Sequence, residues 1–141
     1  MPNQLGGPYQ SGLVRQIFFG QPMTPPTGLY FALTGPTPTN LGYTELNVSN
    51  YARVPAGISN GTGVLSWTEF GVGSGAVYNM GQINFAVASA YWGWASGIIL
   101  VDSAVINGGR MVAYGNISPA KEINTNDQFF IPVSGCLARI S

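Results

Sequence analysis

The sequence of 141 residues contains no histidine, one cysteine and few charged residues. Without histidine, neither a Ser-His-Asp triad nor a Cys-His nucleophile pair can form. The common zinc sites are out of reach for the same reason. Cys136 cannot form an internal disulfide, and a chain of this size needs none, because it buries roughly 68–70% of its unfolded surface on folding. These absences predict a non-enzymatic protein with no cofactor and no metal.

Charge is the second shortage. Asp, Glu, Lys and Arg make up 7% of the residues, with five cations balancing five anions, against about 25% in ordinary soluble domains. Because charge depletion is typical of interface cores, we predict that much of the surface faces protein. An uncharged polar surface rich in Ser, Thr, Asn, Gln and Gly is the alternative. Five dispersed cations form no basic face, so we expect no nucleic-acid partner.

Targeting signals are also missing. The first residues lack the basic start and apolar run of a signal peptide, so we expect a protein that is not secreted. The uncharged stretch over residues 70–101 raises the question of a membrane helix, and Gly93 and Gly97 have the spacing of packed membrane helices. However, polar residues interrupt it, and Trp92 and Trp94 lie inside it rather than at its ends. Buried strands explain the stretch better, and we expect no membrane partner.

Twenty glycines and ten prolines favour turns over long helices. Residues 1–12 show no periodicity and predict an extended N-terminal arm that becomes ordered on a neighbour. A short helix is expected over residues 13–19, with Ser11 as its cap and Gly20 at its end.

From Gly28 onward apolar residues alternate, which predicts strands. We expect them at residues 28–34, 43–54 (long or broken), 64–72, 83–87, 98–101, 110–117, 128–133 and 136–140. The run 98–101 is expected to be buried on both faces. Asn60-Gly61 and Asn107-Gly108-Gly109 predict hairpins, whereas Gly73-Ser74-Gly75 and Asn126-Asp127 predict turns. The fold class is therefore all-β, a β-sandwich of jelly-roll type formed by one domain over residues 13–141.

Two catalytic motifs are weak. Residues 71–76 contain a formal G-x-G-x-x-A, but strand-like residues follow it where a dinucleotide site needs a helix. Paired carboxylates could hydrolyse a glycan. The candidates are Glu45, Glu69, Asp102, Glu122 and Asp127. Each acid is better explained by a turn or a strand face, as Asp127 beside Asn126 illustrates.

The aromatic cluster Tyr91, Trp92 and Trp94 has two interpretations. It can anchor an interface or stack on sugar, or it can fill the core, which we expect for at least one tryptophan. Strand alternation places Trp92 and Trp94 on one face and Tyr91 on the other.

The order of landmarks along the chain resembles a known family. They are the helix over 13–19, Gly28-Leu29-Tyr30-Phe31-Ala32-Leu33, Gly42-Tyr43, Tyr51-Ala52-Arg53-Val54, Trp67, Asn79, Ile83-Asn84-Phe85, Trp92-Gly93, Val101-Asp102-Ser103-Ala104, Gly108-Gly109, Gly115-Asn116-Ile117-Ser118-Pro119, Lys121-Glu122-Ile123, Asn126-Asp127 and Ile131-Pro132. This pattern resembles small tailed-phage virion proteins often labelled tail fibre protein, of which some are capsid cement (decoration) proteins. The first ten residues fall outside the resemblance.

The resemblance implies a jelly-roll homotrimer on the virion surface, made in the host cytoplasm. A compact domain without a repetitive shaft favours a cement protein on the capsid surface, with the major capsid protein as its partner. The alternative is a tail fibre or baseplate module that binds a glycan receptor. The residues predicted to form the assembly interface are Tyr9, Arg53, Tyr91, Trp92 and Trp94.

Overall fold

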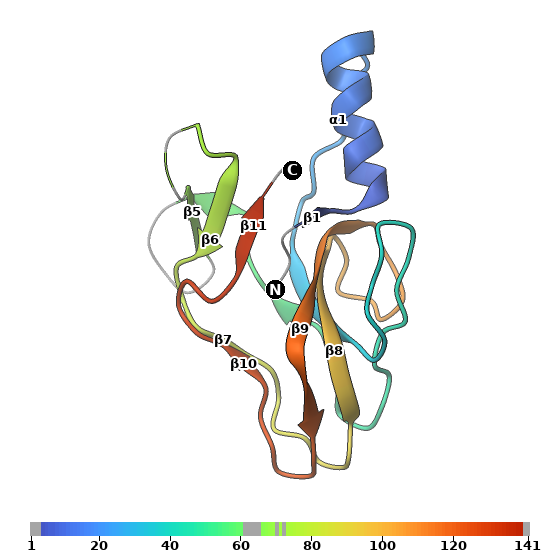
Figure 1. Cartoon of the computed structure of the whole chain (residues 1–141), viewed down its shortest axis with the longest axis vertical. Coiled ribbons are helices and arrows are strands. Elements are labelled where there is room, and N and C mark those ends of the chain that lie inside the picture. The colour runs from blue at the N-terminus through green and yellow to red at the C-terminus, as the bar shows by residue number, and fades with distance from the viewer. Residues whose placement is uncertain (1–3, 61–65, 70, 72, 140–141) are drawn as a thin grey trace.

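The protein is mostly β with one helix, as its computed structural model shows for residues 4–60, 66–69, 71 and 73–139 (Figure 1). The elements are β1 (Gln4–Leu5), α1 (Gly7–Phe19), β2 (Tyr30–Thr34), β3 (Val54–Pro55), β4 (Ser59–Asn60), β5 (Ser66–Glu69), β6 (Ala76–Asn79), β7 (Ile83–Asn84), β8 (Gly93–Val101), β9 (Met111–Ile123), β10 (Phe130–Ile131) and β11 (Leu137–Arg139). The all-β prediction with one N-terminal helix is confirmed.

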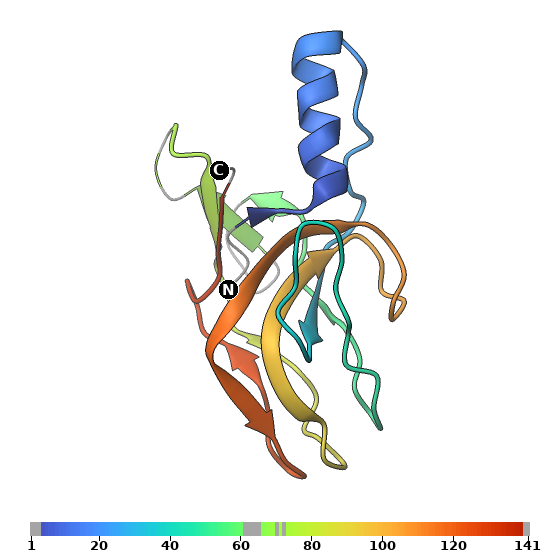
Figure 2. The same ribbon diagram turned by 45° about the vertical axis from the view of Figure 1, so that its right-hand side comes forward.

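The described strands form three sheets. The largest has the order β1-β9-β8-β2-β3, a second has the order β11-β6-β5-β4, and β10 pairs with β7. All named pairings are antiparallel except that of β4 with β5. Figure 2 shows β8 and β9 curving together through the body while α1 projects beyond it. A jelly-roll strand order stays a prediction.

The β8–β9 hairpin is the centre of the fold. Ile98, Ile99, Leu100 and Val101 are all buried, which confirms a strand covered on both faces. One face packs into a core that also includes Phe31, and the other packs with Ala32 and Met111. The predicted turn at residues 107–109 connects the two strands, with positive φ angles of 63° at Asn107 and 79° at Gly109.

The helix begins earlier than the sequence predicts. It starts at Gly7, with Gly6 as the N-cap and a proline in its first turn, which that turn tolerates because the first N–H groups have no helical partner. The predicted arm is therefore wrong over residues 7–12, and so is the cap at Ser11. Residues 1–3 lie outside the described part. The predicted end is confirmed, since Gly20 caps the helix in the left-handed region with φ 66°.

One strand prediction and one hairpin prediction are wrong. Residues 43–53 form a loop with one bridge, Thr34 to Glu45, and only Val54 of the expected strand lies in a strand, β3, because Glu45 and Arg53 turn inward. Asn60 lies in β4, which runs parallel to β5, so no tight hairpin begins there. Gly61 lies outside the described residues, as do residues 64, 65, 70 and 72. The described part of the strand expected over 64–72 is the shorter β5. The alternation of Ile83 and Phe85 is confirmed as buried, whereas Val87 is half-exposed.

Candidate functional site

The five residues predicted to form an interface do not lie together. Tyr9, Arg53 and Trp92 are buried, while Tyr91 and Trp94 are 51% and 54% exposed. Only the last two present enough side chain for a partner to touch.

Arg53 forms a buried ion pair with Glu45. Arg53 Nη2 lies 2.7 Å from Glu45 Oε1, and neither side chain is exposed. Glu45 also accepts hydrogen bonds from the Tyr51 hydroxyl at 2.7 Å and from the Asn107 backbone N–H at 2.9 Å. Arg53 Nη2 donates to the Tyr43 hydroxyl at 3.2 Å. We call the side chains of Glu45, Arg53, Tyr43 and Tyr51 the Glu45 network.

The Glu45 network holds the 43–53 loop against the β8–β9 loop. Arg53 Nη1 donates to the carbonyls of Ser103 at 2.7 Å and Gly108 at 2.9 Å. Desolvation acts to lower the pKa of Arg53, but its hydrogen bonds and attraction to Glu45 outweigh that effect and raise it. Burial and then the hydrogen bond to Glu45 raise the pKa of Tyr51. The four groups therefore keep their partners and serve the fold rather than a substrate.

Tyr9 anchors the base of α1. Its hydroxyl donates to Asp102 Oδ2 at 3.2 Å, and the Arg110 guanidinium lies 4.9 Å from the centre of its ring. Arg110 Nε also donates to Asp102 Oδ2 at 2.8 Å. Desolvation acts to raise the pKa of Asp102, but hydrogen bonds from Arg110 and Tyr9 outweigh it and lower that pKa. This cluster joins the helix to the β8–β9 loop.

The predicted common face of Trp92 and Trp94 is wrong. Trp92 is buried and stacks edge-on against Tyr51 with 5.4 Å between ring centres, whereas Trp94 is exposed. Gly93 separates them with φ 94°, a conformation outside the strand region, so the alternation does not extend back through it. The expectation of one core tryptophan is confirmed by Trp92.

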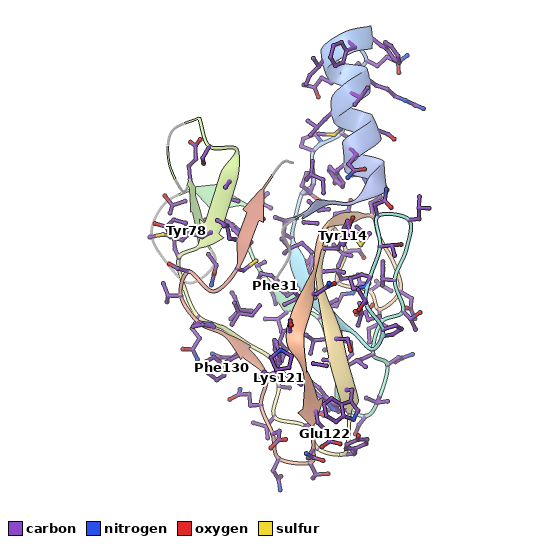
Figure 3. All side chains as sticks on the ribbon, viewed as in Figure 1. Phe31, Tyr78, Tyr114, Lys121, Glu122 and Phe130 are labelled. Carbon is purple, nitrogen blue, oxygen red and sulfur yellow. The ribbon has the colours of Figure 1, made fainter. Side chains whose placement is uncertain are left out.

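Tyr91 and Trp94 lie near the same acid. The Tyr91 hydroxyl donates to Glu122 Oε2 at 2.9 Å, and Trp94 is the strand partner of Glu122. Figure 3 places Lys121 and Glu122 at the end of β9 that is far from α1. The exposed aromatic pair is thus at the opposite end of the body from the helix.

The tip of α1 is an apolar surface that sequence reasoning did not assign to any role. Val14, Ile17, Phe18 and Phe19 are 50%, 70%, 76% and 68% exposed. We call these four side chains the α1 tip. Only Tyr9 of the helix is buried. The signal was visible in the sequence, since these residues recur on a helix that has too few polar positions to be a solvated surface.

A second apolar surface is a groove of about 840 Å³ between the two larger sheets. Its walls include Leu5 of β1 and Pro26 on one side, and Trp67, Val77 and Ala138 of β5, β6 and β11 on the other. Figure 1 shows β5, β6 and β11 beside the helix-bearing part of the body. A hollow of this size accommodates several apolar side chains.

Groups suited to catalysis do not gather at either surface. Among the described residues, no three His, Cys, Asp or Glu side chains are placed to hold a metal ion. Burial raises the pKa of the Cys136 thiol to about 12, which disfavours the reactive thiolate. Within the same residues, no helix is both long and apolar enough to cross a membrane.

The described surfaces therefore define a β-rich protein with apolar side chains exposed at the end of α1 and along a groove. Residues 9–137 match a protein family described as Podophage GP4 fiber I protein gp80. Because the match covers most of the chain, the protein belongs to this family of tailed-phage virion proteins. No curated protein matches the sequence.

Proposed function

We propose that the protein is a non-enzymatic structural subunit of a tailed-phage fibre, which acts by binding other virion subunits. The observation that carries this function is the exposure of the α1 tip. Full burial of a large apolar side chain stabilises by about 1.5–3 kcal/mol relative to exposure. A tip of four such residues, on a chain with 7% charged residues, favours a protein-covered surface.

The fibre assignment is supported by the family description, which names a fibre protein. We therefore rank the fibre ahead of the capsid location that the sequence favoured. In a fibre subunit, Tyr91 and Trp94 offer exposed rings next to the Glu122 carboxylate, which suits stacking against a sugar of a host receptor. A homotrimer remains part of this proposal.

The second candidate is a capsid cement protein bound to the major capsid protein. Its support is the arrangement of the described residues, which form β-sheets and one helix rather than a long repetitive shaft. A cement protein stabilises the shell by binding the intact lattice in preference to a loosened one.

Copy number on purified virions separates these roles. We expect a small number of copies per particle by quantitative mass spectrometry, with antibody label confined to the tail. Hundreds of copies and label over the head would establish the cement role instead. Particles without the protein would refute both, and release of sugar from host polysaccharide by the purified chain would refute the non-enzymatic assignment.

A further inference from the structure

We propose that the α1 tip of one copy docks into the apolar groove of a second copy. The docking deepens the proposed function and rests on it, since it supplies the contact by which fibre subunits join. Both surfaces belong to this chain, so one kind of junction uses each of them once per copy.

Among the described residues, the segment that returns from the helix covers the Gly12 side of α1. A Cβ added at Gly12 would lie 2.6 Å from Met23 Sδ, so the segment that returns from the helix packs closely against this side. Successive helical residues turn by about 100°, which places Val14, Ile17 and Phe18 roughly 140–240° away from Gly12. The base of the helix packs mainly on β9. Val14, Ile17 and Phe18 therefore point away from the returning segment, whereas Phe19, at about 340°, lies on the Gly12 side at the end of the helix.

The groove offers a matching apolar surface on the same molecule. Its rim includes Ile58 and Val77, which are exposed although apolar. The floor includes Trp67, whose indole N–H is already used by the carbonyl of Ala56 at 2.9 Å. An occupant of this groove therefore needs apolar surface more than hydrogen-bonding groups.

Charge complementarity favours α1 of a second copy as the occupant of the groove. Arg15 is the only charged residue of α1, and Glu69 is the only charged residue among those that line the groove. Neither forms an ion pair within the described part of the chain. Arg15 lies next to Val14 and one turn before Phe19. Docking of the α1 tip would therefore bring Arg15 close to Glu69 at the edge of the groove.

The area of one contact predicts a weak junction. The α1 tip would lose on the order of 400–500 Å² of exposed surface, since an aromatic side chain alone buries about 150–250 Å². The exposed lining of the groove is smaller than the tip, so one junction stays below the roughly 1,000 Å² expected of a stable biological interface. A patch that fits a pocket elsewhere on the same molecule forms a heterologous contact, which builds a closed ring or an extended filament.

Disulfide trapping between two single-cysteine variants tests the docking. Full-length Phe18→Cys protein is mixed with full-length Ile58→Cys protein under mild oxidation, with Cys136 left in its buried position. We expect a mixed dimer and little linkage within either variant alone. Predominant Phe18→Cys homodimers would overturn the proposal, because they would show that helices pair with helices.

A charge exchange tests the register. Arg15→Glu and Glu69→Arg should each weaken self-association at least several-fold in sedimentation equilibrium, and the double variant should recover it. Leu41→Ser is the matched control, since Leu41 is 90% exposed but lies outside both surfaces, and it should associate like the wild type. Weakening in the singles without recovery in the double variant would overturn the pairing of these two residues.

Two outcomes separate the docking from the proposed function. If the wild type stays monomeric at submillimolar concentration, and its groove binds an apolar dye as well as the groove of Phe18→Ser does, the docking is refuted and the groove belongs to a small apolar ligand. Antibody label on virions would then still uphold the fibre role. Conversely, trapping as expected with no label on any particle would uphold the docking and refute the function.

Discussion

Around Glu45 the protein buries charge, whereas at the α1 tip it exposes apolar side chains. The Glu45–Arg53 pair has no exposed side-chain surface, and all buried side-chain nitrogen and oxygen atoms in the described residues have partners. The α1 tip, in contrast, leaves half or more of each side chain uncovered. Each arrangement reverses the ordinary distribution of polar and apolar groups.

The two regions differ in whether the contacts that compensate their unusual burial or exposure lie within the same chain. A buried ion pair is tolerated only if its hydrogen bonds are made within the fold, and here loops 43–53 and 102–109 supply them. No described residue covers the exposed tip in this way, and the proposed function assigns that cover to another subunit of the assembly. Changes in the first region should therefore alter folding, and changes in the second should alter association.

The largest expected effect comes from Arg53→Met. It leaves the Glu45 carboxylate buried without its cation, which should cost about 3–5 kcal/mol in the free energy of unfolding. Urea denaturation followed by tryptophan fluorescence measures this loss. If the cost is below about 1 kcal/mol, the pair is not what holds the loop, and the contrast with the tip fails. The double variant Arg53→Met with Glu45→Met should be less destabilised than Arg53→Met alone.

Gly97→Ala should have the next largest effect. The loop between β2 and Glu45 packs so tightly on β8 that a Cβ at Gly97 would collide with Pro38 of this loop, and also with Thr34 Oγ1 of the neighbouring strand β2. Overpacking of this kind typically costs about 1–3 kcal/mol. Thermal denaturation should show a lower Tm. Gly42→Ala is the control, because a Cβ there meets no atom within 4 Å. Equal Tm values for both variants would contradict the tight packing of this loop.

A smaller effect is expected at Asp102, which joins the buried region to the helix. Its lowered pKa means that its stabilising contribution is complete above the ordinary Asp pKa of about 3.9 and is lost as the pH falls through the lowered value. Asp102→Asn should cost about 1 kcal/mol at neutral pH, since Arg110 is partly exposed. Unfolding measured from pH 6 to pH 2 should show a shallower decline for this variant.

Tyr9→Phe supplies the control for that pH dependence. It removes one hydrogen bond to Asp102 but keeps the Arg110 pair, so its decline should lie between those of the wild type and Asp102→Asn. If the wild type and Asp102→Asn lose stability in parallel, another group governs the acid transition.

The sequence predicted the regions in which local signals and tertiary packing agree. The doubly buried run at residues 98–101 and the turn at residues 107–109 were both correct, because apolar content and turn residues specify them directly. The inward turn of Glu45 and Arg53 was not predictable from local sequence. The carbonyls that accept from Arg53 lie 50 and 55 residues further on, and the Asn107 N–H that donates to Glu45 lies 62 residues further on. The opposite orientations of Trp92 and Trp94 on either side of Gly93 were likewise not predictable, because a positive φ has no sequence signal beyond the glycine itself.

The candidate site was less predictable than the fold. The order of landmarks along the chain correctly indicated a family of tailed-phage virion proteins, but the five residues chosen for the interface included three that the fold buries. The residues of the α1 tip were predicted only as part of a short helix over residues 13–19, with no surface assigned to them. Which faces of this helix the body covers depends on Met23 and β9, and both contacts arise only when the chain folds back.

Phe18→Ser should have the smallest effect on folding and so completes the comparison. Because Phe18 is 76% exposed, the free energy of unfolding of the monomer should change by no more than about 0.5 kcal/mol. Self-association measured by sedimentation should nevertheless fall at least tenfold, while Arg53→Met, assayed where it is still folded, keeps an intact tip. A loss of monomer stability of about 2 kcal/mol or more would mean that the chain itself covers Phe18. The tip would then be part of the core, and its apolar side chains would need no partner.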